Sequence, residues 1–284
     1  MSQGKKKIIL TTALTGAVTP KSINANLPTT PEEIAEDAYN CWKAGASIVH
    51  LHMRDDNAEG TMDAARFKKT IELIRSHKDC DVIINCTSSG TNYVATYEQR
   101  MEHFNTIPEI EMGSYDSGTF TWDCDRTFEN KPDFLEALAK CMSKNDILPE
   151  CEIFDMGMLR NAVYYSNKGL LPKNLYCQIV LGVLGGAPAT PAQLEFIVRN
   201  LPEGTKWSAF GIGRDHLPIM YAALALGADG IRVGLEDNVY YSKGVKASNV
   251  MLTERAKKVI ENFDCEVATP SEAREILGIK PLVR

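Results

Sequence analysis

Two histidines separated by one residue are the part of this sequence best suited to metal chemistry. His50 and His52 lie in segment 46–55, which begins as a β-branched apolar run and ends in polar residues, as expected for a buried strand. Because strand side chains alternate between faces, both imidazoles project from one face at the strand end. Neutral imidazole is a common ligand for zinc and other transition metals. The pair therefore forms half of a candidate metal site, although a bare His-x-His pair can also serve only in hydrogen bonding.

A carboxylate far along the chain could complete this site. Glu236 and Asp237 follow the apolar segment 230–233, which reads as the last strand. Two histidines and one carboxylate, here with Glu236 as the carboxylate, form a ligand set of catalytic zinc sites that keeps a coordination position open. The same ligands also suit manganese or iron. As an alternative, Glu236 and Asp237 could mark a helix start, where acidic residues are favoured.

Other polar residues also gather where predicted strands end. They are Asn85, Thr87, Ser88 and Ser89 at the end of the third strand, Ser114 and Asp116 near the end of the fourth, Glu150 and Glu152 on one face of the fifth, Arg214 after the seventh, and Arg232 on the last. A purely structural strand rarely collects so many ionisable groups, so we interpret them as parts of one site. Arg232 and Glu152 could instead form a buried ion pair that only fixes the interior. We interpret Cys86 as a thiol buried in the core of its strand rather than as a catalytic nucleophile.

Strand-like and helix-like segments alternate along the chain, and these elements must position the polar residues. Three Thr-Pro pairs, beginning at Thr30, Thr190 and Thr269, place an N-cap residue before a proline at the first helical position. The predicted strands cover 7–13, 47–52, 82–86, 109–114, 150–154, 175–181, 206–210 and 230–233. The predicted helices cover 31–44, 63–76, 97–104, 132–143, 156–166, 191–199, 216–226, 246–263 and 271–277.

Eight strands, each followed by a helix or a helix-rich connection, predict parallel βαβ units. In a chain of 284 residues, eight such units fit a (β/α)8 TIM barrel better than a doubly wound open sheet, which is the alternative. No linker or repeat divides the sequence. We therefore expect a single domain over residues 1–284, with a short C-terminal helical extension.

Composition narrows the function classes. The net charge of −6 argues against general binding to nucleic acid or anionic membranes. No apolar run is long enough to span a bilayer, and no export signal is apparent. The eight cysteines form no Cys-x-x-Cys pair. We therefore expect reduced thiols in a cytoplasmic protein with small-molecule substrates.

Taken together, the motifs resemble those of the β-keto acid cleavage enzyme family over nearly the whole chain. The segments that carry the resemblance are 15–17 (Thr-Gly-Ala), 27–33 (Leu-Pro-Thr-Thr-Pro-Glu-Glu), 44–46, 50–54 (His-Leu-His-Met-Arg), 149–152 (Pro-Glu-Cys-Glu), 180–183, 211–214 (Gly-Ile-Gly-Arg), 232–238 (Arg-Val-Gly-Leu-Glu-Asp-Asn) and 268–270. The resemblance implies a zinc-dependent barrel that condenses a β-keto acid with acetyl-CoA, giving acetoacetate and a new acyl-CoA. It also implies a homotetramer, and by motif matching it makes His50, His52 and Glu236 the zinc ligands.

The resemblance further implies that Asp237 is the base and that Arg232 and Glu152 are linked to it. A guanidinium beside Asp237 would favour the ionised carboxylate by lowering its pKa. Thr87 takes the place of a family serine that contacts the substrate. Together with Thr87, the candidates for substrate contact are Ser88, Ser114 and Asp116, whose hydroxyl and carboxyl groups lie at the ends of the predicted strands.

One departure from the family concerns the substrate side chain. In the enzyme of lysine fermentation, an acidic residue after the Thr-Gly-Ala turn recognises an amino group, whereas this chain has Val18 there. An ammonium group buried without a counter-charge is costly. We therefore expect an uncharged or apolar side chain on the keto acid, or a quaternary ammonium such as that of dehydrocarnitine held by aromatic rings. The candidate aromatic residues are Tyr93, Tyr115 and Trp122.

Two other function classes fit part of the pattern. Metal-dependent TIM-barrel hydrolases also carry His-x-His on a strand, but they need further histidines at later strand ends. His77, His103 and His216 fall at other predicted positions and receive no role. A non-catalytic metabolite-binding barrel is the second alternative. Arg214, after the seventh strand, is a candidate contact for a phosphate of CoA.

Overall fold

Eight parallel strands form a closed barrel in this computed structural model, which describes residues 4–90 and 95–282. The strands pair in the order β12-β11-β10-β9-β6-β5-β2-β1, and β12 pairs with β1 to close the ring. Their bounds are β1 Lys7–Ala13, β2 Ile48–Leu51, β5 Ile83–Cys86, β6 Met112–Asp116, β9 Leu148–Ile153, β10 Tyr176–Leu181, β11 Lys206–Gly211 and β12 Gly230–Val233. The predicted (β/α)8 barrel is confirmed. The open sheet is wrong, because the first and last strands hydrogen-bond to each other.

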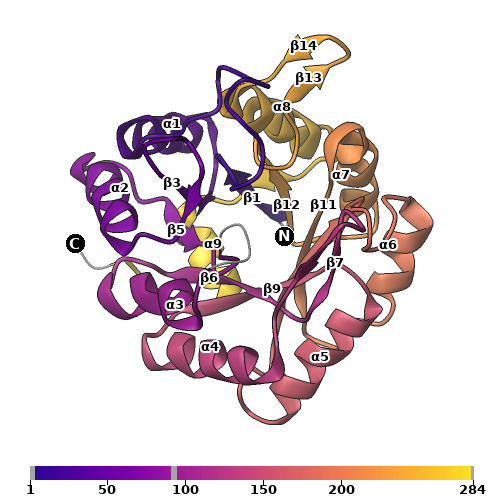
Figure 1. The fold of residues 1–284 in the computed structure, drawn as a ribbon. Coiled ribbons are helices and arrows are strands. Elements are labelled where there is room, and N and C mark those ends of the chain that lie inside the picture. Colours follow the sequence, from indigo (N-terminus) through magenta and orange to yellow (C-terminus); the bar gives the residue numbers. More distant parts are fainter. Residues whose placement is uncertain (1–3, 91–94, 283–284) are drawn as a thin grey trace.

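Eight helices follow these strands and surround the barrel (Figure 1). Their bounds are α1 Pro31–Ala44, α2 Ala64–Ser76, α3 Tyr97–Thr106, α4 Pro132–Lys144, α5 Met156–Asn167, α6 Pro191–Val198, α7 His216–Ala225 and α8 Asn249–Asn262. The predicted Thr-Pro starts are confirmed, since Thr30, Thr190 and Thr269 each accept a hydrogen bond from the backbone N–H three residues later. Within the described ranges, no helix is both long and apolar enough to cross a bilayer.

A ninth helix closes the N-terminal end of the barrel. Helix α9, Pro270–Leu277, packs Ala273, Ile276 and Leu277 against inward side chains at the starts of the strands. These side chains are Ile9, Ile48, Ile83 and Met112. Figure 1 shows α9 in line with the centre of the ring. Because this end is plugged by apolar packing, the opposite end is the one open to substrate.

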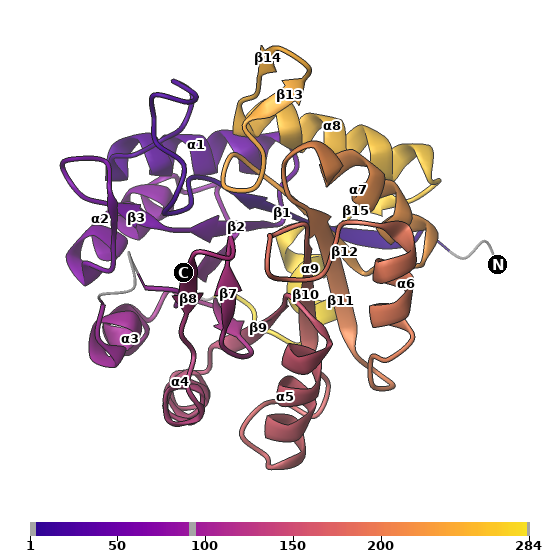
Figure 2. The same cartoon turned by 45° about the vertical axis from the view of Figure 1, so that its right-hand side comes forward.

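Three short hairpins at the strand ends were absent from the prediction. They are β3 Met53–Arg54 with β4 Gly60–Thr61, β7 Phe120–Trp122 with β8 Arg126–Phe128, and β13 Tyr240–Ser242 with β14 Val245–Lys246. Strands of two or three residues have too little alternation to be recognised from sequence. The β13–β14 hairpin rises above the ring of helices (Figure 2). A further short strand, β15 Glu266–Val267, pairs with the start of β1.

The start of helix α1 gives a pH-dependent prediction. Burial raises the pKa of Glu33, but hydrogen bonds from Lys21 Nζ and from the backbone N–H groups of Thr29 and Thr30 outweigh burial and lower it to about 2. The usual value is 4.5, so ionised Glu33 stabilises the fold fully above pH 4.5, and this contribution is lost as the pH falls toward 2. We expect Glu33→Gln to lower the free energy of unfolding by about 0.5–1 kcal/mol at pH 7, since solvent screens this half-exposed pair.

Urea unfolding at pH 7 and pH 3.5 measures this effect. The difference between wild type and Glu33→Gln should shrink at the lower pH. Glu36→Gln is the matched control, because its carboxylate lies on the same helix and accepts a hydrogen bond from Asn40 rather than capping the helix start. An equal loss of stability at both pH values would contradict the assignment.

Candidate active site

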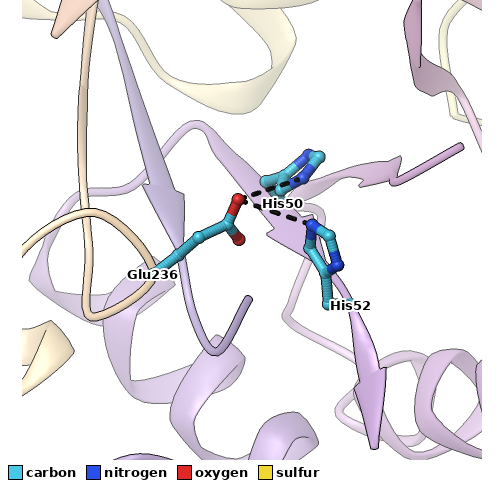
Figure 3. Close-up of side chains that lie close together, drawn as sticks. All are labelled: His50, His52 and Glu236. Carbon is cyan, nitrogen blue, oxygen red and sulfur yellow. Dashed lines mark ion pairs between the residues drawn. The ribbon is translucent and has the colours of Figure 1, made fainter. Parts of the chain in front are cut away.

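The structure brings the three predicted metal ligands together at the C-terminal end of the barrel (Figure 3). One nitrogen of His50, one of His52 and one carboxylate oxygen of Glu236 lie within 4.8 Å of one another. Glu236 Oε1 is 3.8 Å from His50 Nε2 and 3.4 Å from His52 Nε2. In the described part of the chain, this is the one group of histidine, cysteine and acidic residues with metal-site spacing.

Local backbone geometry explains how Glu236 reaches the histidines. His50 lies in β2 and His52 directly follows that strand, so both point inward as the alternation predicted. Glu236 follows β12 through a turn at Gly234, where φ is +143° and a Cβ atom would lie 1.9 Å from the carbonyl oxygen of Ala13. At Gly16, φ is +59° and a Cβ atom would lie 2.7 Å from Cγ of Glu236. Both glycines are therefore required for the carboxylate to fold back over β1.

The protonation of these side chains suits a metal. Burial lowers the pKa of His50 to about 3, so its imidazole is neutral and has a free electron pair for a metal. Burial alone would raise the pKa of Glu236, but electrostatic interactions with His52 and Arg232 hold it well below its usual range. Glu236 Oε2 is buried and has no protein partner. The neutral imidazole, the carboxylate and this unpartnered oxygen together fit a divalent transition metal.

Arg232 connects the metal ligands to the other predicted catalytic groups. Its Nε and Nη2 atoms donate to the two carboxylate oxygens of Asp237, each at 2.9 Å. Nη1 donates to Glu152 at 3.3 Å, and Nη2 also donates to Glu236 at 2.6 Å. The guanidinium lies 4.4 Å from the ring centre of Phe210. The ion pair of Arg232 with Glu152 therefore exists, and it lies within the site rather than serving only the interior.

Asp237 differs from the expectation in its acidity. Burial raises its pKa to about 6, even though Arg232 acts in the opposite direction as predicted. The predicted effect of Arg232 is therefore present, but burial outweighs it, because a carboxylate closed off from water loses more solvation than one guanidinium returns. A carboxylate with a pKa near neutrality suits a general base. The alternative in which Glu236 and Asp237 begin a helix is wrong, since α8 begins at Asn249.

Two more carboxyl groups lie side by side on neighbouring strands. Asp116 on β6 and Glu152 on β9 are register partners, and their side chains hydrogen-bond to each other. Burial is the main factor that raises the pKa of both groups. Two buried carboxyl groups in contact favour a shared proton, so this pair can donate a hydrogen bond as well as accept one.

A cavity of about 1520 Å³ opens above the metal ligands. Its walls include the predicted residues Val18, Thr87, Ser114, Asp116, Glu152, Arg214, Arg232 and Asp237. Single drug-sized ligands occupy roughly 300–1,000 Å³, so this cavity has room for a small substrate and part of a larger one. Arg214 lies at the mouth, where 94% of its side chain is exposed.

Two predicted substrate contacts among the described residues are not brought to this cavity. Ser88 lies behind its wall, where its hydroxyl donates to the carbonyl of Ser114 at 2.6 Å. Tyr115 points to the helix layer, and its hydroxyl donates to the carbonyl of Leu135. The prediction for Tyr115 is wrong because its neighbours Ser114 and Asp116 take the inward positions of β6. Tyr93 lies outside the described residues, whereas Trp122 lines the cavity as predicted.

Several cavity residues were missed from the sequence. His216 begins α7, accepts a hydrogen bond from Arg255 at Nε2 and faces the carbonyl of Gly213 with Nδ1. Other missed residues are Glu59, Asp123, Arg126, Asn238 and the hairpin residues Tyr240–Gly244. Most lie in the short hairpins. Asn238 could have been predicted from the sequence, because it directly follows Glu236 and Asp237.

Known proteins resemble this chain over nearly its full length. A sequence model of the family described as beta-keto acid cleavage enzyme matches residues 7–279. The 3-keto-5-aminohexanoate cleavage enzyme of Acetoanaerobium sticklandii is 38% identical over 275 residues, covering 96% of this chain and 99% of the relative. The 3-dehydrocarnitine:acetyl-CoA trimethylamine transferase of Rhizobium meliloti is 32% identical over 297 residues, covering 96% and 97%. The solved apo structure of ObcA has a TM-score of 0.81 at 21% identity, over 89% of this chain and 66% of that chain, and shows the fold alone.

Proposed function

This chain belongs to the β-keto acid cleavage enzyme family, and from that premise we propose that it condenses a β-keto acid with acetyl-CoA to give acetoacetate and a new acyl-CoA. The observation that carries the proposal is the Arg232 network, which holds a buried carboxylate next to a His-His-Glu ligand set. The relatives, which include a keto acid cleavage enzyme and an acetyl-CoA-dependent transferase, support the reaction class.

The residues divide into distinct roles in this reaction. His50, His52 and Glu236 would hold a zinc ion, which as a Lewis acid supplies charge stabilisation for the oxygen of an enolate. Asp237 removes the proton from the carbon between the two carbonyl groups. Arg232 keeps Asp237 oriented through the two 2.9 Å hydrogen bonds. The resulting carbanion attacks the acetyl thioester and releases the CoA thiolate. The thiolate then adds to the original keto carbon, the bond from that carbon to the former carbanion carbon breaks, and the new acyl-CoA leaves. The acetoacetate carbanion takes back the proton held by Asp237.

The pocket walls recognise the rest of the substrate. Thr87 and Ser114 line the cavity. The Ser114 hydroxyl accepts from the backbone N–H of Ser88, so its proton can go to the substrate carboxylate or to the oxyanion of the adduct, whereas the Thr87 hydroxyl donates to Ser89 at 2.8 Å. Asp116 Oδ2 is buried without a protein partner in the same region, so it can accept a hydrogen bond from the substrate. These contacts place the keto acid against the strand ends, so the part of the cavity lined by the β13–β14 hairpin is left for acetyl-CoA.

The hydrolase alternative has less support. The structure describes all five histidines. Only His50 and His52 lie at the end of a barrel strand close to another candidate metal ligand, Glu236. His77 ends helix α2, and His103 is buried within α3 between Phe67 and Phe104. The test is the conversion of acetyl-CoA, followed by separating free CoA from the acyl-CoA products. Free CoA formed without any β-keto acid would favour a hydrolase, and no loss of acetyl-CoA with any keto acid would favour a non-catalytic barrel.

The substrate side chain gives a second prediction. Val18 lines the cavity at the position of the family's acidic residue and offers no charge to an ammonium group. We expect β-keto acids with uncharged or quaternary ammonium side chains to exceed 5-amino-3-ketohexanoate in kcat/KM by about tenfold or more, the cost of an unpaired charge. A keto acid panel assayed at saturating acetyl-CoA measures this ratio. Val18→Glu should reverse the preference, and a wild-type preference for the primary amine would refute the argument.

Acetyl-CoA recognition gives a third prediction. CoA carries several phosphate charges, and Arg214 and Lys243 both line the mouth of the cavity. We expect Arg214→Ala to raise the KM for acetyl-CoA by about three- to tenfold with little change in kcat, because an exposed charge contributes modestly. Initial-rate kinetics at saturating keto acid measure it. Arg199→Ala on α6 is the control, since that exposed arginine pairs with Glu195. An unchanged KM for Arg214→Ala would remove this contact.

The cellular setting follows from the same premise. We place the enzyme in the cytoplasm, a compartment supported by eight cysteines that are all free thiols. We also expect a homotetramer, as the family resemblance implies. Light scattering of the purified protein measures the mass of the assembly against the 31.4 kDa chain.

A further inference from the structure

The barrel interior below the metal ligands is polar, where barrels of this kind usually pack Val, Ile and Leu. Six inward residues form what we term the interior polar cluster: Thr11, Asn85, Glu150, Tyr176, Gln178 and Ser208. Each is at most 2% exposed, and each has at least one polar atom that makes no well-aligned hydrogen bond, although the Tyr176 hydroxyl lies close to Thr11 and Ser208. Burying unpaired polar atoms is costly, so a cluster that serves packing alone is a poor explanation.

One member of the cluster lies against a metal ligand. His50 and His52 both turn Nε2 toward Glu236, so Nε2 is the atom that faces a metal. A neutral imidazole that uses Nε2 as a ligand carries its proton on Nδ1. Nδ1 of His50 is fully buried and makes no well-aligned hydrogen bond among the described residues. This N–H group therefore needs an acceptor close to its present position.

Asn85 provides that acceptor. In the parallel pair β2–β5, Asn85 is the register partner of His50, so the two side chains enter the interior next to each other. The side chains of Asn85 and His50 lie close enough for a hydrogen bond between them. Its Oδ1 is buried and unpartnered, like Nδ1 of His50. A small rotation of either side chain joins the two unpartnered atoms.

Glu150 determines which end of the Asn85 amide faces His50. Asn85 Nδ2 donates to Glu150 Oε1 at 2.9 Å. With Nδ2 held by the carboxyl group, the amide can present only its oxygen to the imidazole. Glu150 comes from β9, three strands away from β2 around the barrel, and it is fully buried. The orientation is therefore imposed by the tertiary structure.

We propose that Asn85 and Glu150 are positioning residues for the metal ligand His50. The Glu150 carboxyl group orients the Asn85 amide, and the amide oxygen accepts a hydrogen bond from Nδ1–H of His50. The proposal rests on the metal site of the proposed function. Ligand histidines commonly donate their second N–H to such a partner, and loss of the partner weakens metal affinity by about 10–100-fold. Here the acceptor is an amide supported by a carboxyl group on a distant strand.

Zinc affinity of the apo-protein, measured by competition with a chromophoric chelator, tests the proposal without using activity. We expect Asn85→Leu to weaken zinc binding by about 10–100-fold and Glu150→Met by a smaller factor, since only the orientation of the amide is then lost. Glu150→Gln should rescue most of the affinity, because its amide oxygen can still accept from Asn85. Ser208→Ala is the matched control, since it removes another member of the interior polar cluster without touching the proposed relay.

Two spectroscopic readouts separate positioning from a general loss of stability. The visible spectrum of the cobalt-substituted protein should change in Asn85→Leu and remain unchanged in Ser208→Ala. In zinc-loaded wild type, long-range ¹H–¹⁵N NMR should show His50 protonated at Nδ1, a result that needs no variant to fold. A His50 ring protonated at Nε2, or a folded Asn85→Leu protein with zinc affinity within threefold of wild type, would overturn the proposal. Failure of wild type to bind zinc would instead contradict the metal site of the proposed function.

Discussion

An Asp237→Asn variant is expected to lose about three orders of magnitude in kcat while it retains its metal. Asp237 is held by Arg232 through two hydrogen bonds, lines the cavity and follows the ligand Glu236 directly. The amide has nearly the same shape as the carboxylate but cannot take a proton from the substrate. Its NH₂ group would also face the guanidinium, which can only donate. The loss should therefore appear in kcat rather than in metal content.

Hydrogen–deuterium exchange isolates this step. In deuterium oxide, wild type should exchange the protons between the two carbonyl groups of the keto acid faster than the uncatalysed rate, even without acetyl-CoA. Asp237→Asn should abolish the enzymatic part of the exchange. The control is Asp264→Asn, whose exposed carboxylate pairs with Lys5 far from the site. Exchange at the wild-type rate in Asp237→Asn would assign the base to another residue.

Removal of one metal ligand should have the second large effect. We expect His50→Ala to purify with little zinc and to lose at least about a thousandfold in kcat/KM, because one of three protein ligands is gone and the enolate oxygen loses its charge partner. Glu236→Gln should act in the same direction, since a neutral amide is a weaker ligand. Metal analysis beside steady-state kinetics measures both effects.

Matched variants and metal exchange make this test specific. His77→Ala is the control, because His77 stacks on Tyr39 at the end of α2 and has no ligand partner. Wild type treated with a chelator should become inactive and recover when zinc is added. Recovery of activity with manganese or iron but not with zinc would contradict the assignment of zinc as the metal. A full zinc content in His50→Ala would remove His50 from the ligand set.

Much of the fold was predictable because its signals are local. The limits of β1 and β12 match the predicted ranges, and those of helix α1 follow from Thr30, Pro31 and the glycine after Ala44. Such signals need only a few adjacent residues, since alternation and helix caps act over one or two turns. The same alternation places Ser114 and Asp116 inward, and it should have placed Tyr115 outward. The alternation along β6 is therefore regular, and only the prediction that Tyr115 faces the substrate departs from it.

The sequence by itself determined the eight βα units, the inward faces of their strands and the residue types able to hold a metal. Only the tertiary structure decided that His50 and Glu236 meet. His50 lies in β2 and Glu236 follows β12, and these two strands become neighbours of β1 when the barrel closes. The tertiary structure also decided the acidity of Asp237, since burial depends on the whole cavity wall. Alternation is a property of neighbouring residues, whereas contact and solvation depend on segments far apart in the chain, so the first can be read from sequence and the second requires the folded barrel.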